Sequence, residues 1–234
     1  MIVVIPYASN KIDLAVLLTQ LQMQEVLPKS IYLADNSPDG SGVEIAERYQ
    51  WKVPIATQRN VGNIHHSWNA GMRYAGDQDV VILNDDIMLP RDFVAVMGQY
   101  MASGEAAMYC PKNPGFPPVH KVRKGYDWTP KSTLSYYFLD HEQYQLPPSI
   151  SGWCMGIPKK TRDEIGFFDE DLGLYFGDKD YEHRIFEAKK KVCFISGMYV
   201  QHFGSSSTKK MDPKAHNQLY IDDEKKYKKK WRIV

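Results

Sequence analysis

The sequence predicts an α/β fold with a Rossmann-like, mostly parallel central sheet flanked by helices. Two observations support this prediction. Short apolar runs alternate with helical patterns over residues 1–110, and polar, turn-forming segments follow the runs. Alternation of this kind implies parallel strands joined by right-handed crossovers. Because ligands bind beyond the carboxyl ends of such strands, the loops that follow them are predicted to line one shared cleft.

The elements of this half follow in order. Residues 2–5 form a continuous β-branched run that stops at Pro6, which indicates a buried strand. Four leucines between Leu14 and Leu21 have i, i+3, i+4, i+7 spacing and predict a helix face. Pro90 suits the first turn of a later helix. Further strands are predicted at 31–34, 53–56, 80–83 and 106–109, and further helices at 43–49, 64–75 and 91–101.

The second half is less regular. Residues 111–150 are rich in proline and aromatic residues and predict an irregular excursion that covers or extends the cleft. Helices are predicted at 159–166 and 179–190, and one or two strands at 192–203. Residues 209–234 are rich in lysine and are expected to form a helix or to be partly disordered, with a solvated, fraying helix as the simplest interpretation.

The charge of the chain is nearly balanced but unevenly spread. The 234 residues carry 29 basic and 28 acidic side chains, for a formal net charge of +1. Residues 209–234 have a local net charge of +5, which leaves −4 for the rest of the chain. This distribution does not fit a dedicated nucleic-acid binder, although the tail could meet phosphates on a membrane, a glycan or DNA.

Composition also indicates the compartment. No apolar run approaches the roughly 18 residues that span a bilayer, and the first residues resemble no signal peptide. The three cysteines form no Cys-x-x-Cys pair, which argues against a zinc knuckle or a disulfide framework. A cytoplasmic protein without a transmembrane segment is therefore expected.

The sharpest chemical candidate is Asn84-Asp85-Asp86, directly after the fourth predicted strand. A carboxylate at that strand end is held rigidly and faces the cleft. Asp86 could bind a hard cation such as Mg²⁺ or Mn²⁺, which prefers oxygen ligands and bridges to substrate phosphates. The alternative is a simple turn, since Asn and Asp favour turns and helix caps.

Two further candidates follow the second and third strands. Asp35 could accept a hydrogen bond from a nucleotide base, or it could close an Asx-turn, which is the simpler explanation. The segment containing Arg59, Asn60 and Gly62 precedes a helix, where glycine permits close backbone approach and Arg59 could contact a diphosphate. No Gly-x-Gly-x-x-Gly or P-loop motif is present.

The last candidates lie in the second half. Asp178 lies near a predicted helix N-terminus, which stabilises an anion, and it could serve as a general base or simply as a helix cap. His202 ends a predicted strand, where an imidazole could complete a metal site, although a lone histidine is more often a packed or solvated residue.

The order of these signals is more specific than any one of them. Read together, they resemble the GT-A glycosyltransferases, most closely the large inverting family 2. The resemblance covers about residues 1–208, and its matching segments are 5–10, Asp35-Asn36-Ser37-Pro38-Asp39-Gly40-Ser41, Asn60-Val61-Gly62, Asn69-Ala70-Gly71, Leu83-Asn84-Asp85-Asp86, 151–156, 168–172, 176–181 and Val200-Gln201-His202-Phe203-Gly204-Ser205. Two departures stand out: Asn84 replaces the first Asp of the family's DxD segment, and Gly177 replaces the Glu that usually precedes the base.

The resemblance implies a metal-dependent transfer of a sugar from a nucleoside diphosphate donor to a hydroxyl acceptor with inversion. The family uses UDP most often, with TDP and GDP also common. Asp35 would suit the N3–H of uracil or thymine, so UDP or TDP is expected first. It implies Asp178 as the general base with Asp180 as the fallback, and Mn²⁺ or Mg²⁺ on Asp86 and His202. It implies a nucleotide-binding half at 1–110, an acceptor and catalytic half at 111–208 and a separate basic tail at 209–234. The implied donor-binding residues are Pro6, Tyr7, Asp35, Arg59, Asn60, Gly62, Asn84 and Asp85, and those for sugar or acceptor are Gly152, Trp153 and Cys154.

The acceptor and several rival functions stay open. A glycan, a glycolipid or a hydroxylated DNA base would each suit a hydroxyl acceptor, and peripheral contact through the basic tail would suit the last two. A sugar nucleotidyltransferase shares the layout, but it would carry a glycine-rich loop where residues 6–10 contain no glycine. A non-catalytic nucleotide-sugar or glycan binder and a nucleic-acid-binding module are the remaining alternatives.

Overall fold

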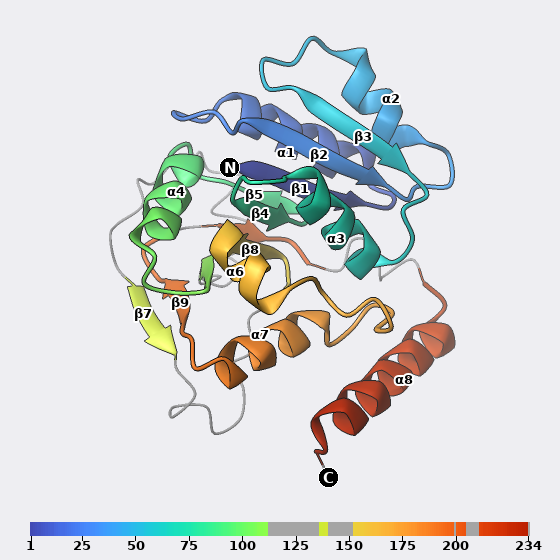
Figure 1. The fold of residues 1–234 in the computed structure, drawn as a ribbon. Helices are drawn as coiled ribbons and strands as arrows, with labels where there is room; N and C mark the ends of the chain where they lie inside the picture. The colour runs from blue at the N-terminus through green and yellow to red at the C-terminus, as the bar shows by residue number, and fades with distance from the viewer. Residues whose placement is uncertain (112–135, 140–151, 199, 205–210, 234) are drawn as a thin grey trace, which may run out of the picture.

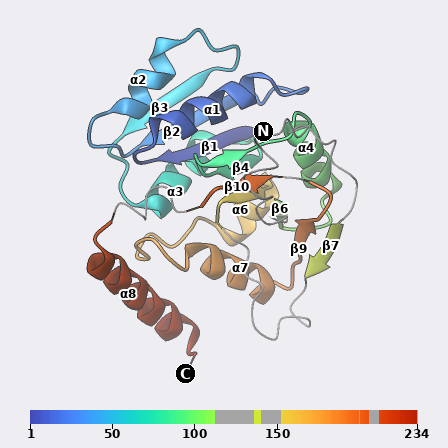
Figure 2. The same ribbon diagram turned by 180° about the vertical axis from the view of Figure 1, so that it is seen from behind.

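The computed structural model describes residues 1–111, 136–139, 152–198, 200–204 and 211–233 (Figure 1). Its centre is an eight-stranded sheet in the order β3-β2-β1-β4-β8-β6-β9-β7. Most of the predicted excursion at 111–150 lies outside the described residues. Helices cover both faces of the sheet, and α8 lies beside the segment before α7 at one end of the molecule (Figures 1 and 2).

The first four strands confirm the parallel arrangement predicted from the sequence. Both β2 and β4 pair in parallel with β1, and β3 pairs in parallel with β2. The third strand starts two residues later than expected. The four strands are β1 (Ile2–Tyr7), β2 (Ser30–Asp35), β3 (Ile55–Arg59) and β4 (Val80–Leu83).

Alternate residues of β1 enter two different cores, which explains why its sequence is apolar throughout. Val3 and Ile5 pack with helices on one face, whereas Ile2 and Val4 pack on the other. The first face is covered by α1 (Lys11–Gln22), α2 (Ser41–Arg48) and α4 (Phe93–Ser103). The second is covered mainly by α3 (Ile64–Tyr74) and α7 (Gly177–Glu187), with α6 (Lys159–Ile165) packed beside them.

The second half of the sheet departs from the prediction. Residues 151–156 resemble a glycine-rich loop of the GT-A family, but Cys154–Ile157 is strand β8, which pairs antiparallel with β4 and with β6. The strand predicted at 106–109 is therefore not a direct neighbour of β4. The remaining strands are β6 (Met108–Pro111), β7 (Tyr136–Leu139) and β9 (Val192–Ile195).

Helix α4 begins later than its sequence suggests. Its first residue is Phe93, so Pro90 lies before the helix rather than in its first turn. The side chain of Gln24 explains the shift, because its Nε2 donates to the Pro90 carbonyl at 2.9 Å and its Oε1 accepts from the Val94 N–H at 3.0 Å. A contact across 70 residues thus sets the start of this helix.

The C-terminal residues form a docked helix rather than a solvated one. Helix α8 (Pro213–Trp231) places Asp223 and Tyr227 in buried positions against the segment that precedes α7. Among the described residues, no helix has the length and apolar character needed to cross a membrane.

Helix α3 lies unusually close to the sheet at Gly71. A Cβ placed on Gly71 would lie 2.3 Å from Cγ1 of Val4, inside the buried core. We expect Gly71→Ala to lower the free energy of unfolding by about 1–3 kcal/mol, because overpacking forces neighbouring groups apart. Denaturant unfolding measures this, with Gly98→Ala in α4 as a control, because an added Cβ there would meet only the flexible end of the Met1 side chain, at 3.1 Å. A change of under about 0.5 kcal/mol in Gly71→Ala would contradict the tight packing.

Candidate functional site

The carboxyl ends of the first three strands bring three predicted donor-binding residues into register. Tyr7 of β1 pairs with Asp35 of β2, and Asp35 pairs with Arg59 of β3. The segment from Asn84 to Asp86 follows β4 at the same edge, since β4 is parallel to β1. The strand register therefore places these loops at one edge of the sheet, and the shared cleft stays a prediction.

Asp35 serves the turn that follows its strand. Its Oδ1 accepts from the N–H and the hydroxyl of Ser37 at 2.9 and 2.5 Å, and its Oδ2 accepts from the Val43 N–H at 2.9 Å. The carboxylate is fully buried. This geometry matches the Asx-turn alternative, and a contact with a nucleotide base would require the covering residues to move.

Tyr7 and Pro6 are largely enclosed at the end of β1. The Tyr7 side chain is 1% exposed, and its hydroxyl lies 2.9 Å from the hydroxyl of Ser41. Burial raises the pKa of Tyr7, so the phenol stays protonated. These residues shape the floor of the edge and offer a ligand little side-chain surface.

The loop after β3 is organised by Asn36, a residue to which the sequence analysis gave no role. Its Oδ1 accepts from the N–H groups of Val61 at 2.8 Å and Gly62 at 3.3 Å, while its Nδ2 donates to Ser67 Oγ at 2.8 Å. Gly62 has φ +117°, a conformation that favours glycine. Asn60 has φ 55°, which asparagine tolerates better than most residues.

Arg59 contributes a guanidinium at the rim of this edge. Its Nη2 donates to the Ser37 carbonyl at 3.1 Å, and the side chain lies over Gly40, where an added Cβ would be 2.9 Å from Cζ. The residue itself is exposed. The guanidinium is thus positioned by backbone contacts yet accessible from solvent, as contact with a diphosphate requires.

The two predicted metal ligands lie together. His202 Nε2 is 3.1 Å from Asp86 Oδ1, although 116 residues separate them. A two-stranded antiparallel sheet of β5 (Ile87–Met88) and β10 (Gln201–His202) brings them together, and the Phe203 N–H donates to the Asp86 carbonyl at 3.0 Å. The Asp86 side chain is nearly buried, whereas that of His202 is 18% exposed.

This pair supplies a carboxylate oxygen, which suits Mn²⁺ or Mg²⁺, and an imidazole nitrogen, which suits transition-metal ions better than Mg²⁺. Within the described part of the chain, no group of three or more His, Cys, Asp or Glu side chains could hold a metal ion. Two protein ligands fit a cation that takes its remaining ligands from substrate phosphates and water, which is the usual arrangement for Mg²⁺ at phosphate sites.

Asp178 lies in the first turn of α7 with both carboxylate oxygens oriented. Oδ2 accepts from the Gly152 N–H at 2.8 Å, and Oδ1 accepts from the Lys179 N–H at 2.9 Å. Burial raises the pKa of this carboxyl. The two N–H groups and His65 lower the pKa and so offset part of this rise. A carboxylate with a raised pKa is a stronger proton acceptor, as a general base requires.

His65 packs against the residue that precedes Asp178. A Cβ on Gly177 would lie 2.0 Å from His65 Nε2, so the close approach requires glycine at position 177. His65 Nδ1 lies 2.8 Å from the Leu172 carbonyl, and burial lowers the pKa of the ring, which favours a neutral imidazole that donates to this carbonyl. The departure from the family pattern at Gly177 thus has a steric reason.

Residues 152 and 153 connect Asp178 to the pair formed by Asp86 and His202. Gly152 donates to Asp178, and the ring of the next residue, Trp153, stacks on His202 with centroids 5.3 Å apart and planes at 11°. The Trp153 carbonyl accepts from the Asn84 N–H at 2.9 Å. Asp178 and His202 therefore contact one short segment directly, and Asp86 is linked to it through His202.

Two other predicted site residues, Cys154 and Asp180, are buried among groups of the protein itself. Cys154 is fully buried in β8, where it pairs with Leu83, so its thiol faces the core rather than a ligand. Asp180 is also fully buried, and its carboxylate contacts Arg184, Lys230 and Trp231 at 3.1, 2.7 and 3.0 Å. These contacts give Asp180 a role in holding α8 and make Asp178 the stronger candidate for the predicted base.

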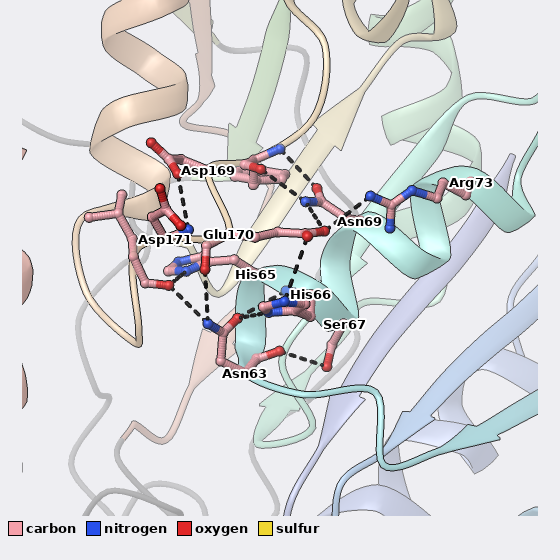
Figure 3. Close-up of polar contacts among 11 residues, drawn as sticks. Asn63, His65, His66, Ser67, Asn69, Arg73, Asp169, Glu170 and Asp171 are labelled. Atoms are coloured by element: carbon pink, nitrogen blue, oxygen red, sulfur yellow. Dashed lines mark hydrogen bonds and ion pairs between the residues drawn. The ribbon is translucent and has the colours of Figure 1, made fainter. Parts of the chain in front are cut away.

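A polar network ties α3 to the segment at 168–172 (Figure 3). The Asn69 side chain exchanges hydrogen bonds with the Phe168 backbone and donates to Glu170 Oε1 at 2.8 Å. Asn63 and Arg73 reach the same segment, at the Leu172 carbonyl and Glu170. Asn69 and Glu170 both lie in segments that resemble the family, but spacing along the sequence cannot pair residues 101 positions apart, so their contact was not predicted.

Known proteins resemble this chain in sequence family and in fold. A model of a family described as "Glycosyl transferase family 2" matches residues 2–166. No curated protein shows significant sequence similarity to the chain.

Solved structures share the fold at low sequence identity. S. aureus TarS 1–349 in complex with UDP superposes with a TM-score of 0.64 at 13% identity, over 97% of this chain and 71% of that one. The same protein in complex with UDP-GlcNAc gives 0.65 at 14%, over 93% and 63%. Mannosyltransferase PcManGT from Pyrobaculum calidifontis, in complex with GDP-Man and Mn²⁺, gives 0.59 at 17%, over 82% and 55%. At such identities the likeness establishes the fold alone.

Proposed function

Because the chain belongs to glycosyl transferase family 2, we propose that it moves a sugar from a nucleoside diphosphate donor to a hydroxyl acceptor with inversion. The family match confirms the glycosyltransferase class expected from the sequence, and the solved structures confirm the GT-A fold. Metal dependence, stereochemistry, donor and acceptor are parts of the proposal.

The observation that carries the proposal is the convergence of Asp178 with Asp86 and His202 on Gly152 and Trp153. The family's reaction needs a base on one side of the anomeric carbon and charge stabilisation for the leaving diphosphate on the other. A shared two-residue segment provides one rigid frame for both groups.

In the proposed reaction, Asp178 accepts the proton of the acceptor hydroxyl. The acceptor oxygen then bonds to the anomeric carbon as the bond from that carbon to the diphosphate oxygen breaks, and the nucleoside diphosphate leaves with the electron pair. Attack from the face opposite the diphosphate inverts the anomeric centre. The N–H groups of Gly152 and Lys179 fix the direction of the carboxylate during this transfer.

A divalent cation fits Asp86 and His202, and Mn²⁺ or Mg²⁺ is proposed there. Bound at this pair, it would offset the negative charge that the diphosphate gains. Arg59 is proposed to add a second positive charge at the rim. The crystallised mannosyltransferase with GDP-Man and Mn²⁺ supports this choice of metal.

We propose UDP or TDP as the first nucleotides to test. TarS was crystallised with UDP and UDP-GlcNAc, whereas the mannosyltransferase was crystallised with GDP-Man. The buried carboxylate of Asp35 weakens the argument that this residue selects a pyrimidine. The loop of Asn36, Asn60 and Gly62 supplies the alternative donor-facing surface at the same edge.

A thermal-shift panel of nucleotide sugars with Mn²⁺ tests the donor class. A specific ligand at 100 times its Kd stabilises the folded state by about 2.7 kcal/mol, which raises Tm by several degrees. We expect one nucleotide sugar to stabilise the protein more than the other nucleotide sugars do, and more than its own free sugar does. Equal melting temperatures across the panel would contradict the proposal, and pyrophosphate release from a sugar phosphate plus a nucleoside triphosphate would indicate a nucleotidyltransferase.

A glycan acceptor is preferred over the two acceptors that the basic tail would serve, a glycolipid and a hydroxylated DNA base. Part of the positive charge in α8 is used within the protein, because Lys230 binds Asp169 and Asp180, Lys226 binds the Asp171 carbonyl, and Lys228 binds Glu224. Less charge is therefore available for phosphates than the sequence suggests. Salt-sensitive DNA binding would reverse this preference.

A further inference from the structure

Helix α8 contacts the chain on both sides of Asp178, and this arrangement gives it a role beyond packing. Residues 213–231 lie outside the segment matched by the family model. The helix nevertheless contacts the chain at two places near Asp178. One is the segment that precedes Asp178, and the other is Asp180, two residues after Asp178. Asp178 itself touches Gly152 and Lys179.

The contact before the base is made by Asp223. Its carboxylate is 1% exposed and accepts from three successive backbone N–H groups, those of Gly173 and Leu174 at 2.8 Å and of Tyr175 at 3.0 Å. Burial alone would raise the pKa of Asp223, but these donors lower it below its usual range. Charge-assisted bonds to three consecutive amides fix the path of a segment that has no regular secondary structure.

The next residue in the segment is held by aromatic contacts. Phe176 has φ 66°, an unfavourable conformation for a residue with a side chain, and it directly precedes α7. Its ring stacks on Tyr227 with centroids 5.2 Å apart and planes at 29°, and Tyr220 lies at the same centroid distance. Such a conformation persists only where the surroundings enforce it, and two rings from α8 do so here.

The contacts after the base are polar. Trp231 Nε1 donates to Asp180 Oδ1 at 3.0 Å, and Lys230 Nζ lies 2.7 Å from the same oxygen. Lys230 also reaches Asp169 at 2.6 Å. The same helix, α8, therefore contacts both the first turn of α7 and the segment that precedes α7.

We propose that α8 is a positioning element for the general base, in which Asp223 fixes the turn that presents Asp178 to the acceptor. The proposal rests on the proposed function, because it assumes that Asp178 is the base. Asp223 touches no reacting atom and acts through the backbone of residues 173–177. A misplacement of about 1 Å at a catalytic group can reduce turnover by about 10²-fold, so the loss of this tie should appear in kcat.

The test compares Asp223→Ala and Asp223→Asn with Asp222→Ala in the full chain. Asp222 lies on the same helix but bonds to Gln218 within it, so its replacement removes a carboxylate and leaves residues 173–180 untouched. Hydrogen–deuterium exchange measures the segment directly. We expect faster exchange at 173–180 in both Asp223 variants, unchanged exchange in β1 and β4, and no change in Asp222→Ala.

The functional readout uses hydrolysis of the donor sugar identified by thermal shift, with water as the acceptor. We expect kcat to fall about 10- to 100-fold in Asp223→Ala while the Kd for the donor stays within twofold, because the base moves and the donor site does not. The acid limb of the pH profile should move to lower pH, since water admitted around Asp178 eases its ionisation. His65 and Lys179 are the other titratable groups that act on Asp178, and neither is altered.

The outcomes separate the two proposals. Unchanged exchange at 173–180, or faster exchange with unchanged kcat and pH profile, would overturn the positioning role. A parallel loss of donor affinity and kcat would also overturn it, because that pattern indicates general unfolding. If the unaltered protein hydrolysed no nucleotide sugar, the proposed function would fail and the positioning role with it, whereas the exchange data would still show whether α8 holds the segment.

Discussion

Replacing Asp178 with Asn is expected to reduce sugar transfer by about 10²- to 10⁴-fold, the range that general-base assistance contributes. The amide has the shape of the carboxylate but cannot accept the proton of the acceptor hydroxyl. It can still accept one of the two hydrogen bonds from Gly152 and Lys179. Donor hydrolysis or transfer measures the rate, and titration calorimetry should find nearly the same Kd for the nucleotide.

The pH dependence of the unaltered enzyme follows from the same residue. Burial raises the pKa of Asp178 above the usual value for aspartate of about 3.9. The base must be ionised to act, so activity should fall as the pH is lowered through this raised pKa, at a higher pH than an exposed aspartate would give. An acid limb at or below about pH 4 would contradict the environment described for Asp178.

Two control variants show whether the loss of activity is specific to Asp178. Asp171→Asn makes the same chemical change at an exposed position seven residues earlier, and its activity should equal that of the unaltered protein. Asp180→Asn tests the fallback base; because Asp180 contacts Arg184, Lys230 and Trp231, it should lower Tm and leave the acid limb in place. If Asp178→Asn transferred sugar at the normal rate, Asp178 would not be the base.

The first half of the fold could be predicted because its signals are local. Continuous β-branched runs, leucine spacing and turn-forming segments each act within a few residues, and the four parallel strands follow from them. The same rule placed Asp35, Arg59 and Asp86 at one edge. Their individual contacts were not predictable, since Asp35 bonds to its own turn and Asn36, not Asp35, organises the next loop.

The errors occur where distant contacts override local pattern. Cys154–Ile157 follows a glycine-containing segment that looks like a loop, but β4 and β6 pair with it on both sides and make it a strand. The lysine-rich residues at the end of the chain look solvated, but buried Asp223 and Tyr227 dock them. One acidic and one aromatic residue among many lysines gave no periodic signal for this docking.

Replacing Asp86 with Ala is expected to remove the effect of Mn²⁺ on donor binding. In the unaltered protein, Mn²⁺ should tighten binding of the nucleotide sugar at least about tenfold. Loss of a residue that only supports a metal ligand already costs about 10- to 100-fold in metal affinity, so loss of a direct ligand should cost at least as much. In Asp86→Ala, calorimetry with and without Mn²⁺ should give the same Kd. Asp77→Ala, which removes an exposed carboxylate bound to Lys159, should retain the full Mn²⁺ effect.

His202→Ala distinguishes a metal site from a simple ion pair, because both explanations account for the 3.1 Å contact with Asp86. If both side chains bind one cation, His202→Ala should lose most of the Mn²⁺ effect, and the double variant should lose little more than Asp86→Ala, since the two residues act as a unit. If the pair only joins β5 to β10, each variant should lower Tm and leave the Mn²⁺ effect intact. That second pattern would remove the cation from the mechanism while leaving Asp178 as the base.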